Sequence, residues 1–259
     1  MKPESRSIES RHEIERHFHD QKVTAPERSD KRDFYAAGGL DIVWRAYLAS
    51  AGDLRGKRVL DFGCGEGWSA LEYARRQATV HSFDISPESV RNLVASADGD
   101  RAVQQRLYPA VMAAEQLGYA SESFDLVLGV GILHHTDLSV VSGEIARVLR
   151  PGGRALFMEP LAHNPLLRLF RVLTPWRRTP TERPLSVREV RAFGRAFAHA
   201  EFRGFHLVGI LPQGLLWATG SRRLFAWTLR LCEQLDRWLL SAVPALHRYT
   251  WSAIIEVRR

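Results

Sequence analysis

The chain has 259 residues, 45% of them hydrophobic and 25% charged, with a formal net charge of +7. A chain of that length can bury one large α/β core without disulfide bonds or a structural metal. Its two cysteines, Cys64 and Cys232, are too few and too far apart for a disulfide framework or a cysteine zinc site. Residues 1–20 are charged nearly throughout, which excludes an ordinary signal peptide, and no apolar run approaches the ~20 residues that span a bilayer. We therefore expect a cytoplasmic protein.

The excess of basic charge lies in the second part of the chain. Residues 150–259 hold 18 basic and 7 acidic side chains, whereas residues 1–149 hold 18 and 22. Nearly all of these basic residues are arginine, so either a functional basic face or a general bias toward arginine explains the excess. No recognised DNA- or RNA-binding module is visible, and we expect no nucleic-acid partner.

Residues 1–54 predict an N-terminal helical lid. Ser5 to Lys31 is polar and compatible with helix, and Phe34 to Ala51 carries apolar residues close to a helical stripe. Within this segment Tyr35 and Trp44 either contact a bound small molecule or pack on the core.

Residues 55–160 alternate between strand and helix patterns. Strands are predicted at 58–62, 79–84, 110–113, 124–130 and 154–159, and helices at 69–76, 87–97 and 138–149, with Ser86 and Asp137 as caps of the last two. This alternation is typical of a doubly wound, mostly parallel sheet.

A glycine-rich turn and a second acid indicate a nucleoside site in this sheet. Gly63, Gly65 and Gly67 follow the first strand and let a ligand lie against the backbone. Asp84 ends the second strand, where an acid can accept both ribose hydroxyls. Adenosine is therefore the expected ligand.

Charge favours one adenosine cofactor over another. A nicotinamide or flavin dinucleotide would place its pyrophosphate on this turn, but Asp61 and Glu66 put two carboxylates beside it. The sulfonium and ammonium of S-adenosylmethionine would be attracted to Asp61, directly or through water. An oxidoreductase using NAD(P) is the alternative interpretation.

The chain resembles class I S-adenosylmethionine-dependent methyltransferases of the small-molecule, methyltransferase type 11-like group. Besides Val59 to Gly67 and Asp84, the resemblance rests on Ser123 to Val127, on Leu133-His134-His135, and on Leu149 to Gly153 with the strand ending at Glu159-Pro160. It implies a Rossmann-like, seven-stranded sheet with an antiparallel last strand, and a site with no metal. It implies further that S-adenosylmethionine, leaving as S-adenosylhomocysteine, is bound by Asp61, Gly63, Gly65, Gly67, Asp84, Ile85, Ala114, Glu115 and Val130.

One position departs from this family pattern. Similar proteins often carry an Asp that meets the adenine amino group two residues before an acid like Glu115, and here that position is Ala113. Glu115 or the backbone around Ala114 is expected to replace this contact.

The histidine pair after the fourth strand supplies the candidate base. His134 and His135 follow the carboxyl end of that strand, where ligands of open α/β sheets bind. Either could take a proton from an acceptor hydroxyl, with Glu159 orienting it, or the pair simply shapes the loop. Adjacent histidines without convergent partners do not predict a zinc site.

Residues 161–259 are expected to complete the same catalytic domain. His163, Arg168, Arg171 and Trp217 are candidate acceptor contacts; the arginines would grip an anionic group or form a solvated face. A helix is predicted at 186–198, strands at 205–211 and 249–257, and a helical cap at about 212–248. One side of the cap carries a mostly apolar stripe that would pack on the domain. Contact with a second copy of the chain or with a membrane surface is the alternative. The stripe is formed by Leu224, Thr228, Leu231, Leu235, Trp238 and Leu239.

These features predict methyl transfer from S-adenosylmethionine to a small, partly apolar and conceivably anionic acceptor, at oxygen. Transfer to nitrogen or carbon of a natural product or lipid-like acceptor, and a non-catalytic adenosylmethionine-binding or assembly protein, are alternatives. The expected partner is a small molecule, peripheral membrane contact stays open, and the protein would be a monomer or a homodimer.

Overall fold

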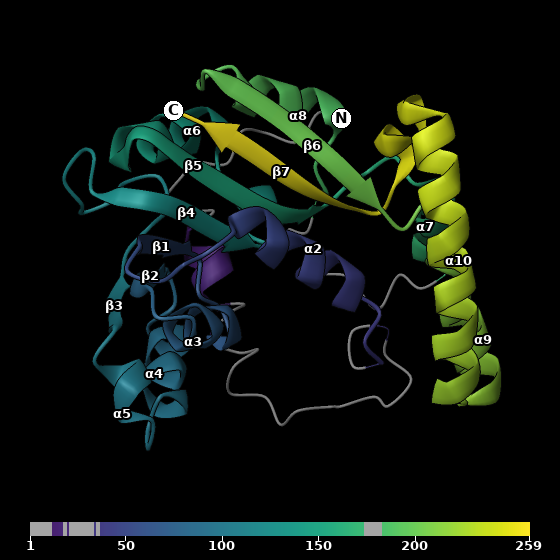
Figure 1. The fold of residues 1–259 in the computed structure, drawn as a ribbon, viewed down its shortest axis with the longest axis horizontal. Coiled ribbons are helices and arrows are strands. Elements are labelled where there is room, and N and C mark those ends of the chain that lie inside the picture. The colour runs from purple at the N-terminus through teal and green to yellow at the C-terminus, as the bar shows by residue number, and fades with distance from the viewer. Residues whose placement is uncertain (1–11, 18–19, 21–33, 35–36, 174–182) are drawn as a thin grey trace.

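The computed structural model describes residues 12–17, 20, 34, 37–173 and 183–259. Its centre is a seven-stranded sheet of order β3-β2-β1-β4-β5-β7-β6. β7 is antiparallel to both β5 and β6, and the other neighbouring strands run parallel. The predicted doubly wound sheet with an antiparallel last strand is confirmed (Figure 1). The strands are β1 (Arg58–Phe62), β2 (Thr79–Asp84), β3 (Leu107–Val111), β4 (Phe124–Val130), β5 (Leu149–Pro160), β6 (His199–Phe205) and β7 (Ser252–Arg258).

Helices cover both faces of this sheet. One face packs against α2 (Asp41–Ala51), α3 (Trp68–Arg75), α4 (Pro87–Ser96) and α5 (Arg101–Gln104). The other packs against α6 (Leu138–Val148) and α8 (Val187–Gly194). Because both faces are covered, the central strands are nearly continuous apolar runs, as parallel sheets require.

Side-chain caps fix where several helices begin. Ser86 Oγ accepts the N–H of Ser89 at 3.1 Å, and Asp137 Oδ1 accepts the N–H of Ser139 at 3.0 Å, as the sequence predicts. Ser186 and Glu189 form a capping box at α8. The caps of α4 and α6 matter for function because both helices start at the edge of the sheet where the strands end.

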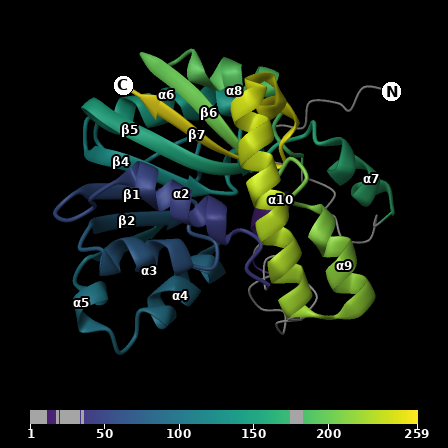
Figure 2. The same ribbon diagram turned by 45° about the vertical axis from the view of Figure 1, so that its right-hand side comes forward.

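The segment between β6 and β7 is a helical hairpin, as expected from its length. It contains α9 (Leu211–Thr219), α10 (Arg222–Ala242) and the short helix η3 (Pro244–Tyr249). α9 and α10 lie side by side at one end of the molecule, near α7 (Pro165–Leu173) (Figures 1 and 2). A separate apolar cluster joins this hairpin to the domain through Phe34, Leu167, Leu216, Phe225, Leu229 and Trp251.

Some predicted boundaries are wrong in the C-terminal part. β6 occupies 199–205 and not 205–211, and α8 ends at Gly194 and not at 198. β6 is the last strand of the sheet and most of its side chains are exposed, so it lacks the apolar signature of a strand. β3, at 107–111 rather than 110–113, is the opposite edge strand and shows the same effect.

The predicted packing stripe of α10 is only partly a packing face, since Leu224, Thr228 and Leu239 are half-buried. Leu231, Leu235 and Trp238 are exposed, whereas Phe225 and Leu229 are buried together with Asp236 and Leu240. Within the described residues no helix is both long and apolar enough to cross a bilayer. Of the lid predicted at residues 1–54, the polar part from Ser5 to Lys31 lies outside the described residues, apart from a helical stretch at 12–17 and residue 20.

Candidate functional site

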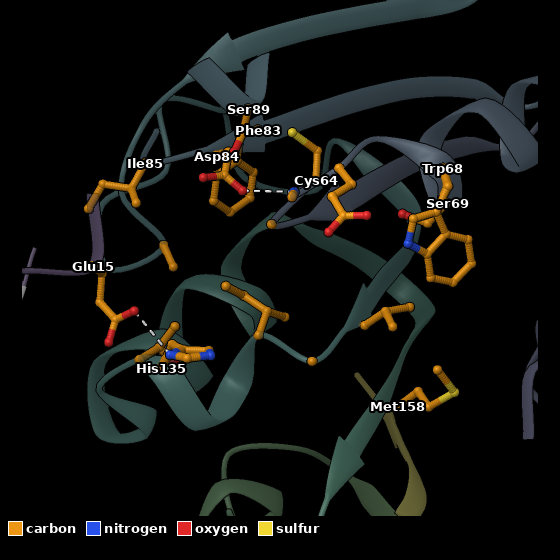
Figure 3. A pocket seen from close by; sticks show the side chains of 18 of the residues that line it. Glu15, Cys64, Trp68, Ser69, Phe83, Asp84, Ile85, Ser89, His135 and Met158 are labelled. Atoms are coloured by element: carbon orange, nitrogen blue, oxygen red, sulfur yellow. Dashed lines mark hydrogen bonds and ion pairs between the residues drawn. The ribbon is translucent and has the colours of Figure 1, made fainter. Parts of the chain in front are cut away.

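A cavity of about 850 Å³ opens at the carboxyl ends of β1, β2, β4 and β5. The strand order reverses between β1 and β4, and this is where open α/β sheets bind ligands. Residues from the N-terminal helical stretch and from α2 complete its lining. Figure 3 shows Glu15 of the N-terminal stretch facing His135. Its lining includes His12, Glu15, Leu40, Asp41, Trp44, Gly63, Gly65, Glu66, Trp68, Ser69, Phe83, Asp84, Ile85, Met112, Ala114, Glu115, Val130, Ile132, His135 and Met158.

The turn after β1 is tied to the end of β2 by Asp84. Its Oδ2 accepts the N–H of Gly65 at 2.9 Å, and its Oδ1 accepts the N–H of Ser86 at 2.9 Å (Figure 3). Gly65 has φ of 49°, and a side chain there would enter open space. The carboxylate is therefore fixed at the cavity wall, where the backbone leaves room for a ligand.

Gly63 is required for a different reason. It has φ of 78°, and a Cβ on it would come within 2.6 Å of Ile132 in the loop after β4. Gly67 caps α3 in a left-handed conformation against Leu93 and does not line the cavity. Two of the three glycines thus shape the cavity directly, and the third shapes the helix behind it.

Asp61 lies behind the cavity wall. Its carboxylate accepts hydrogen bonds from Ser82 Oγ at 2.5 Å and Ser69 Oγ at 3.1 Å. Burial raises the pKa of Asp61 to about 6, against the two serine hydrogen bonds, which lower it. Ser69 lines the cavity and Asp61 does not, so of the two predicted modes, direct or through water, the position of Asp61 favours an indirect one.

An apolar slot lies between the ends of β2 and β3. It is formed by Phe83, Ile85, Met112 and Ala114, and Ala113 takes no part. Glu115 is engaged elsewhere: its Oε1 accepts the N–H of Asp137 at 3.0 Å, and its Oε2 lies 2.9 Å from His12 Nε2.

The two histidines after β4 have different surroundings. His134 Nδ1 lies 2.7 Å from Glu159 Oε2, and these side chains are 7% and 0% exposed. Glu159 Oε1 also accepts the N–H groups of Ile132 and Leu133, at 2.9 and 2.8 Å. Glu159 therefore orients His134 and fixes the loop, but neither side chain lines the cavity.

His135 faces the cavity. Its Nδ1 lies 3.1 Å from Glu15 Oε2 of the N-terminal helical stretch (Figure 3). Its ring stacks at a tilt on His134, with centroids 4.0 Å apart. Glu15 and the His12–Glu115 contact were not predicted, because they join residues about a hundred positions apart.

Aromatic rings form the wall nearest α2. Trp44 meets Trp68 edge-on, with centroids 4.7 Å apart, and stacks on Tyr47 at 5.4 Å. Tyr47 is anchored beneath them because its hydroxyl donates to the carbonyls of Gly129 and Leu156. Burial raises the pKa of Tyr47, so it stays a neutral donor. This wall, with Leu40 and Met158, gives the cavity an apolar end.

Among the predicted acceptor contacts whose side chains the structure describes, Trp44 alone lines the cavity. His163 is exposed and its Nε2 accepts the N–H of Val187 at 3.4 Å, Arg168 is exposed, and Trp217 is half-buried on α9. Tyr35 and the side chain of Arg171 lie outside the described residues. Trp68 and Met158 also line the cavity and were not predicted. Their positions are the available signal, since Trp68 follows the glycine turn and Met158 precedes Glu159 near the end of β5.

Residues 60–157 match the model of a family described as a methyltransferase domain. The chain is thus similar to methyltransferase domains over 98 of its 259 residues. Within the described residues no group of three or more His, Cys, Asp or Glu side chains could hold a metal ion. The family match therefore covers β1 to β5, which carry most of the cavity lining.

Relatives and solved structures agree with this domain. A ubiquinone biosynthesis O-methyltransferase of Xanthomonas oryzae pv. oryzae (strain PXO99A) is 38% identical over 125 residues, which are 46% of this chain and 49% of that protein. The match thus spans about half the length of such curated relatives.

Two solved structures share the fold over nearly the whole chain. The geranyl diphosphate C-methyltransferase of Streptomyces coelicolor A3(2) superimposes with a TM-score of 0.60 at 15% identity, covering 96% of this chain and 98% of its own. The magnesium protoporphyrin IX methyltransferase of Synechocystis PCC 6803 gives 0.57 at 17% identity, covering 96% and 99%. Both were solved with bound S-adenosylhomocysteine. At these identities the likeness is one of fold.

Proposed function

We propose that the protein transfers a methyl group from S-adenosylmethionine to an oxygen of a small, partly apolar acceptor. The observation that carries this proposal is the cavity itself. At one end Asp84 is fixed by the N–H of Gly65, and at the other Trp44, Trp68 and Met158 form an apolar wall. The first end suits a ribose and the second suits an apolar acceptor.

The residues present fit this cofactor. Asp84 would accept the ribose hydroxyls, and the slot of Phe83, Ile85, Met112 and Ala114 would take the adenine ring. Because Glu115 is engaged with Asp137 and His12, the backbone at Ala114 is the better substitute for the missing Asp at position 113.

The carboxylates around the glycine turn support a cationic cofactor over a dinucleotide. Glu66 and Asp84 line the cavity, and Asp61 lies behind Ser69. Negative side chains at this turn would repel a pyrophosphate and attract a sulfonium. When bound, S-adenosylmethionine supplies a methyl group already activated by the positive charge on its sulfur.

The chain then has to align the acceptor, exclude water and remove a proton. The pair of Trp44 and Trp68 would hold an apolar acceptor and limit its orientations. The contacts of His12 and Glu15 with Glu115 and His135 close the cavity from the N-terminal side.

His135 is the better placed of the two candidate bases. It lines the cavity, whereas His134 is buried against Glu159. With Nδ1 3.1 Å from Glu15 Oε2, the acceptor proton would be taken at Nε2, and the nearby carboxylate would stabilise the imidazolium that forms. His134 would act through the stacked ring as a positioning residue.

The described lining favours a neutral or cationic acceptor. It contains the carboxylates of Glu15, Asp41, Glu66, Asp84 and Glu115, and within the described residues no arginine or lysine. Asp41 beside Trp44 would also suit an ammonium group, so transfer to nitrogen is the second candidate. The name of the Xanthomonas relative supports transfer to oxygen.

The test is methyl transfer from isotopically labelled S-adenosylmethionine to a panel of apolar phenols and amines. We expect label to enter phenolic oxygen in the wild type and, at much lower rates, in His135→Ala. Transfer to amines alone would replace the oxygen assignment with the nitrogen one. Absence of transfer to every acceptor, despite tight cofactor binding, would contradict the proposal.

A further inference from the structure

The outer face of α10 carries a row of exposed apolar side chains. Trp227, Leu231, Leu235 and Trp238 are 57%, 45%, 45% and 65% exposed. They follow one another at spacings of four, four and three residues, so they form one stripe along the helix. Two tryptophans and two leucines in one exposed row are unusual on a helix whose other side already packs on the domain.

The inner face of α10 accounts for its attachment. Phe225 and Leu229 are buried in the cluster with Phe34 and Trp251. Asp236 Oδ2 and Oδ1 accept the N–H groups of Leu207 and Val208, both at 2.9 Å. These contacts account for the attachment of the helix without the outer stripe.

A row of arginines runs beside the apolar stripe. Arg223, Arg230 and Arg237 are all exposed and lie seven residues apart, which places them on one side of the helix. Arg223 and Arg230 are the i−4 and i+3 neighbours of Trp227. The two acids of α10 are on the inner side: Asp236 is buried and Glu233 is half-buried near Asp41 and Arg45 of α2.

We propose that this outer face docks on a membrane surface that contains anionic lipids. Tryptophan and leucine would enter the boundary between headgroups and acyl chains, and the arginines beside them would meet lipid phosphates. The charge pattern favours this occupant over a second copy of the chain. Glu233 and Asp236 lie inward, and Glu233 already has Arg237 within electrostatic reach, so in a symmetric dimer the outer face would offer Arg223 and Arg230 no carboxylate.

Docking through α10 would also bring one end of the cavity close to the membrane. Glu233 interacts electrostatically with Asp41 and Arg45, and α2 contributes Asp41 and Trp44 to the rim and wall of the cavity. α10 therefore lies within electrostatic reach of the helix that carries part of the apolar end of the cavity. A protein docked through α10 would hold that end close to the bilayer, which suits an acceptor dissolved in lipid. This consequence rests on the proposed function, whereas the docking itself does not.

The test is co-sedimentation with vesicles of equimolar phosphatidylglycerol and phosphatidylcholine, compared with phosphatidylcholine alone. We expect binding to the anionic vesicles that weakens as salt rises. The triple variant R223Q/R230Q/R237Q should bind roughly 100-fold more weakly at low salt, because each arginine near an anionic surface contributes roughly fivefold. R188Q/R191Q/R195Q, which removes the same charge from two exposed positions of α8 and from the exposed residue that ends it, should bind like the wild type.

A second triple variant, W227S/L231S/W238S, tests the apolar stripe, with V94S on α4 as the exposed apolar control. W227S/L231S/W238S should lose vesicle binding while keeping the wild-type melting temperature and affinity for S-adenosylhomocysteine. Failure of the wild type to bind either vesicle, or equal losses in the α8 variant, would overturn the proposal. So would a lipid-free dimer that W227S/L231S/W238S dissociates, which would assign the face to a second copy.

Discussion

The glycine-turn side of the cavity and the α9–α10 hairpin show two ways in which this chain positions side chains. At the turn, short-range backbone constraints do the work: Gly63 and Gly65 adopt left-handed conformations and Asp84 accepts the N–H of Gly65. In the hairpin, position depends on which of two apolar faces of α10 meets the domain. The first kind of site can be recognised in sequence, and the second is decided by tertiary packing.

The catalytic end of the cavity should show the largest effect. We expect His135→Ala to lower turnover by about 10² to 10⁴, the usual contribution of a general base, with cofactor affinity unchanged. His134→Ala should instead disturb the loop held by Glu159 and change cofactor affinity as well. Steady-state kinetics with an oxygen acceptor separates the two, and His163→Ala is the exposed control. Unchanged turnover in His135→Ala would remove His135 from the mechanism.

In the hairpin, substitutions on the inner face of α10 should lower the stability of the protein, and substitutions on its outer face should leave the stability nearly unchanged. Phe225→Ala should destabilise the protein by about 3 to 5 kcal/mol because it empties a packed cluster. Trp238→Ala, which is 65% exposed, should change stability by no more than about 0.5 kcal/mol. Denaturant unfolding of both variants measures this. Comparable losses would mean that the outer face is a packing face after all.

The buried acid behind the turn predicts a pH dependence. Asp61 has an ordinary pKa of 3.8 in the unfolded chain and a pKa of about 6 in the fold, so between these values the folded state keeps a proton that the unfolded state has lost. Raising the pH through this window therefore lowers stability, by up to about 3 kcal/mol. Asp61→Asn should lack this decline. Unfolding free energies of both proteins between pH 4 and 7 check it, and parallel profiles would argue against the raised pKa.

Asp84→Ala should weaken binding of S-adenosylhomocysteine by about 2 kcal/mol, because the ribose hydroxyls lose a charged acceptor. The Gly65 N–H would lose its partner in Asp84→Ala as well. Asp84→Asn keeps an oxygen acceptor, so its affinity for S-adenosylhomocysteine should lie between those of the wild type and Asp84→Ala. Calorimetric titration gives the order. Equal affinities for all three proteins would show that Asp84 does not hold the ribose.

The sequence predicts the central strands and the cofactor end closely. β1, β2 and β4 lie at the predicted residues, and the caps Ser86 and Asp137 start α4 and α6 as expected. These features depend on local signals: buried apolar runs, glycines and capping side chains.

The same reasoning fails where the signal is weak or ambiguous. The exposed edge strands lack apolar alternation, and β6 was predicted six residues too late. α10 has two apolar rows, and the sequence does not show that Phe225 and Leu229 pack on the domain while Leu231 and Trp238 stay exposed. The contact of Glu15 with His135 bridges distant parts of the chain and leaves no local pattern.

Above all, we infer that the carboxylates around Gly63, Gly65 and Asp84 form an acidic site that binds a positively charged adenosyl donor. The most direct test of this inference is a pair of calorimetric titrations, one with S-adenosylmethionine and one with NAD⁺. The account predicts saturable binding of S-adenosylmethionine and no measurable binding of NAD⁺. Tight binding of NAD⁺ with none of S-adenosylmethionine would contradict it.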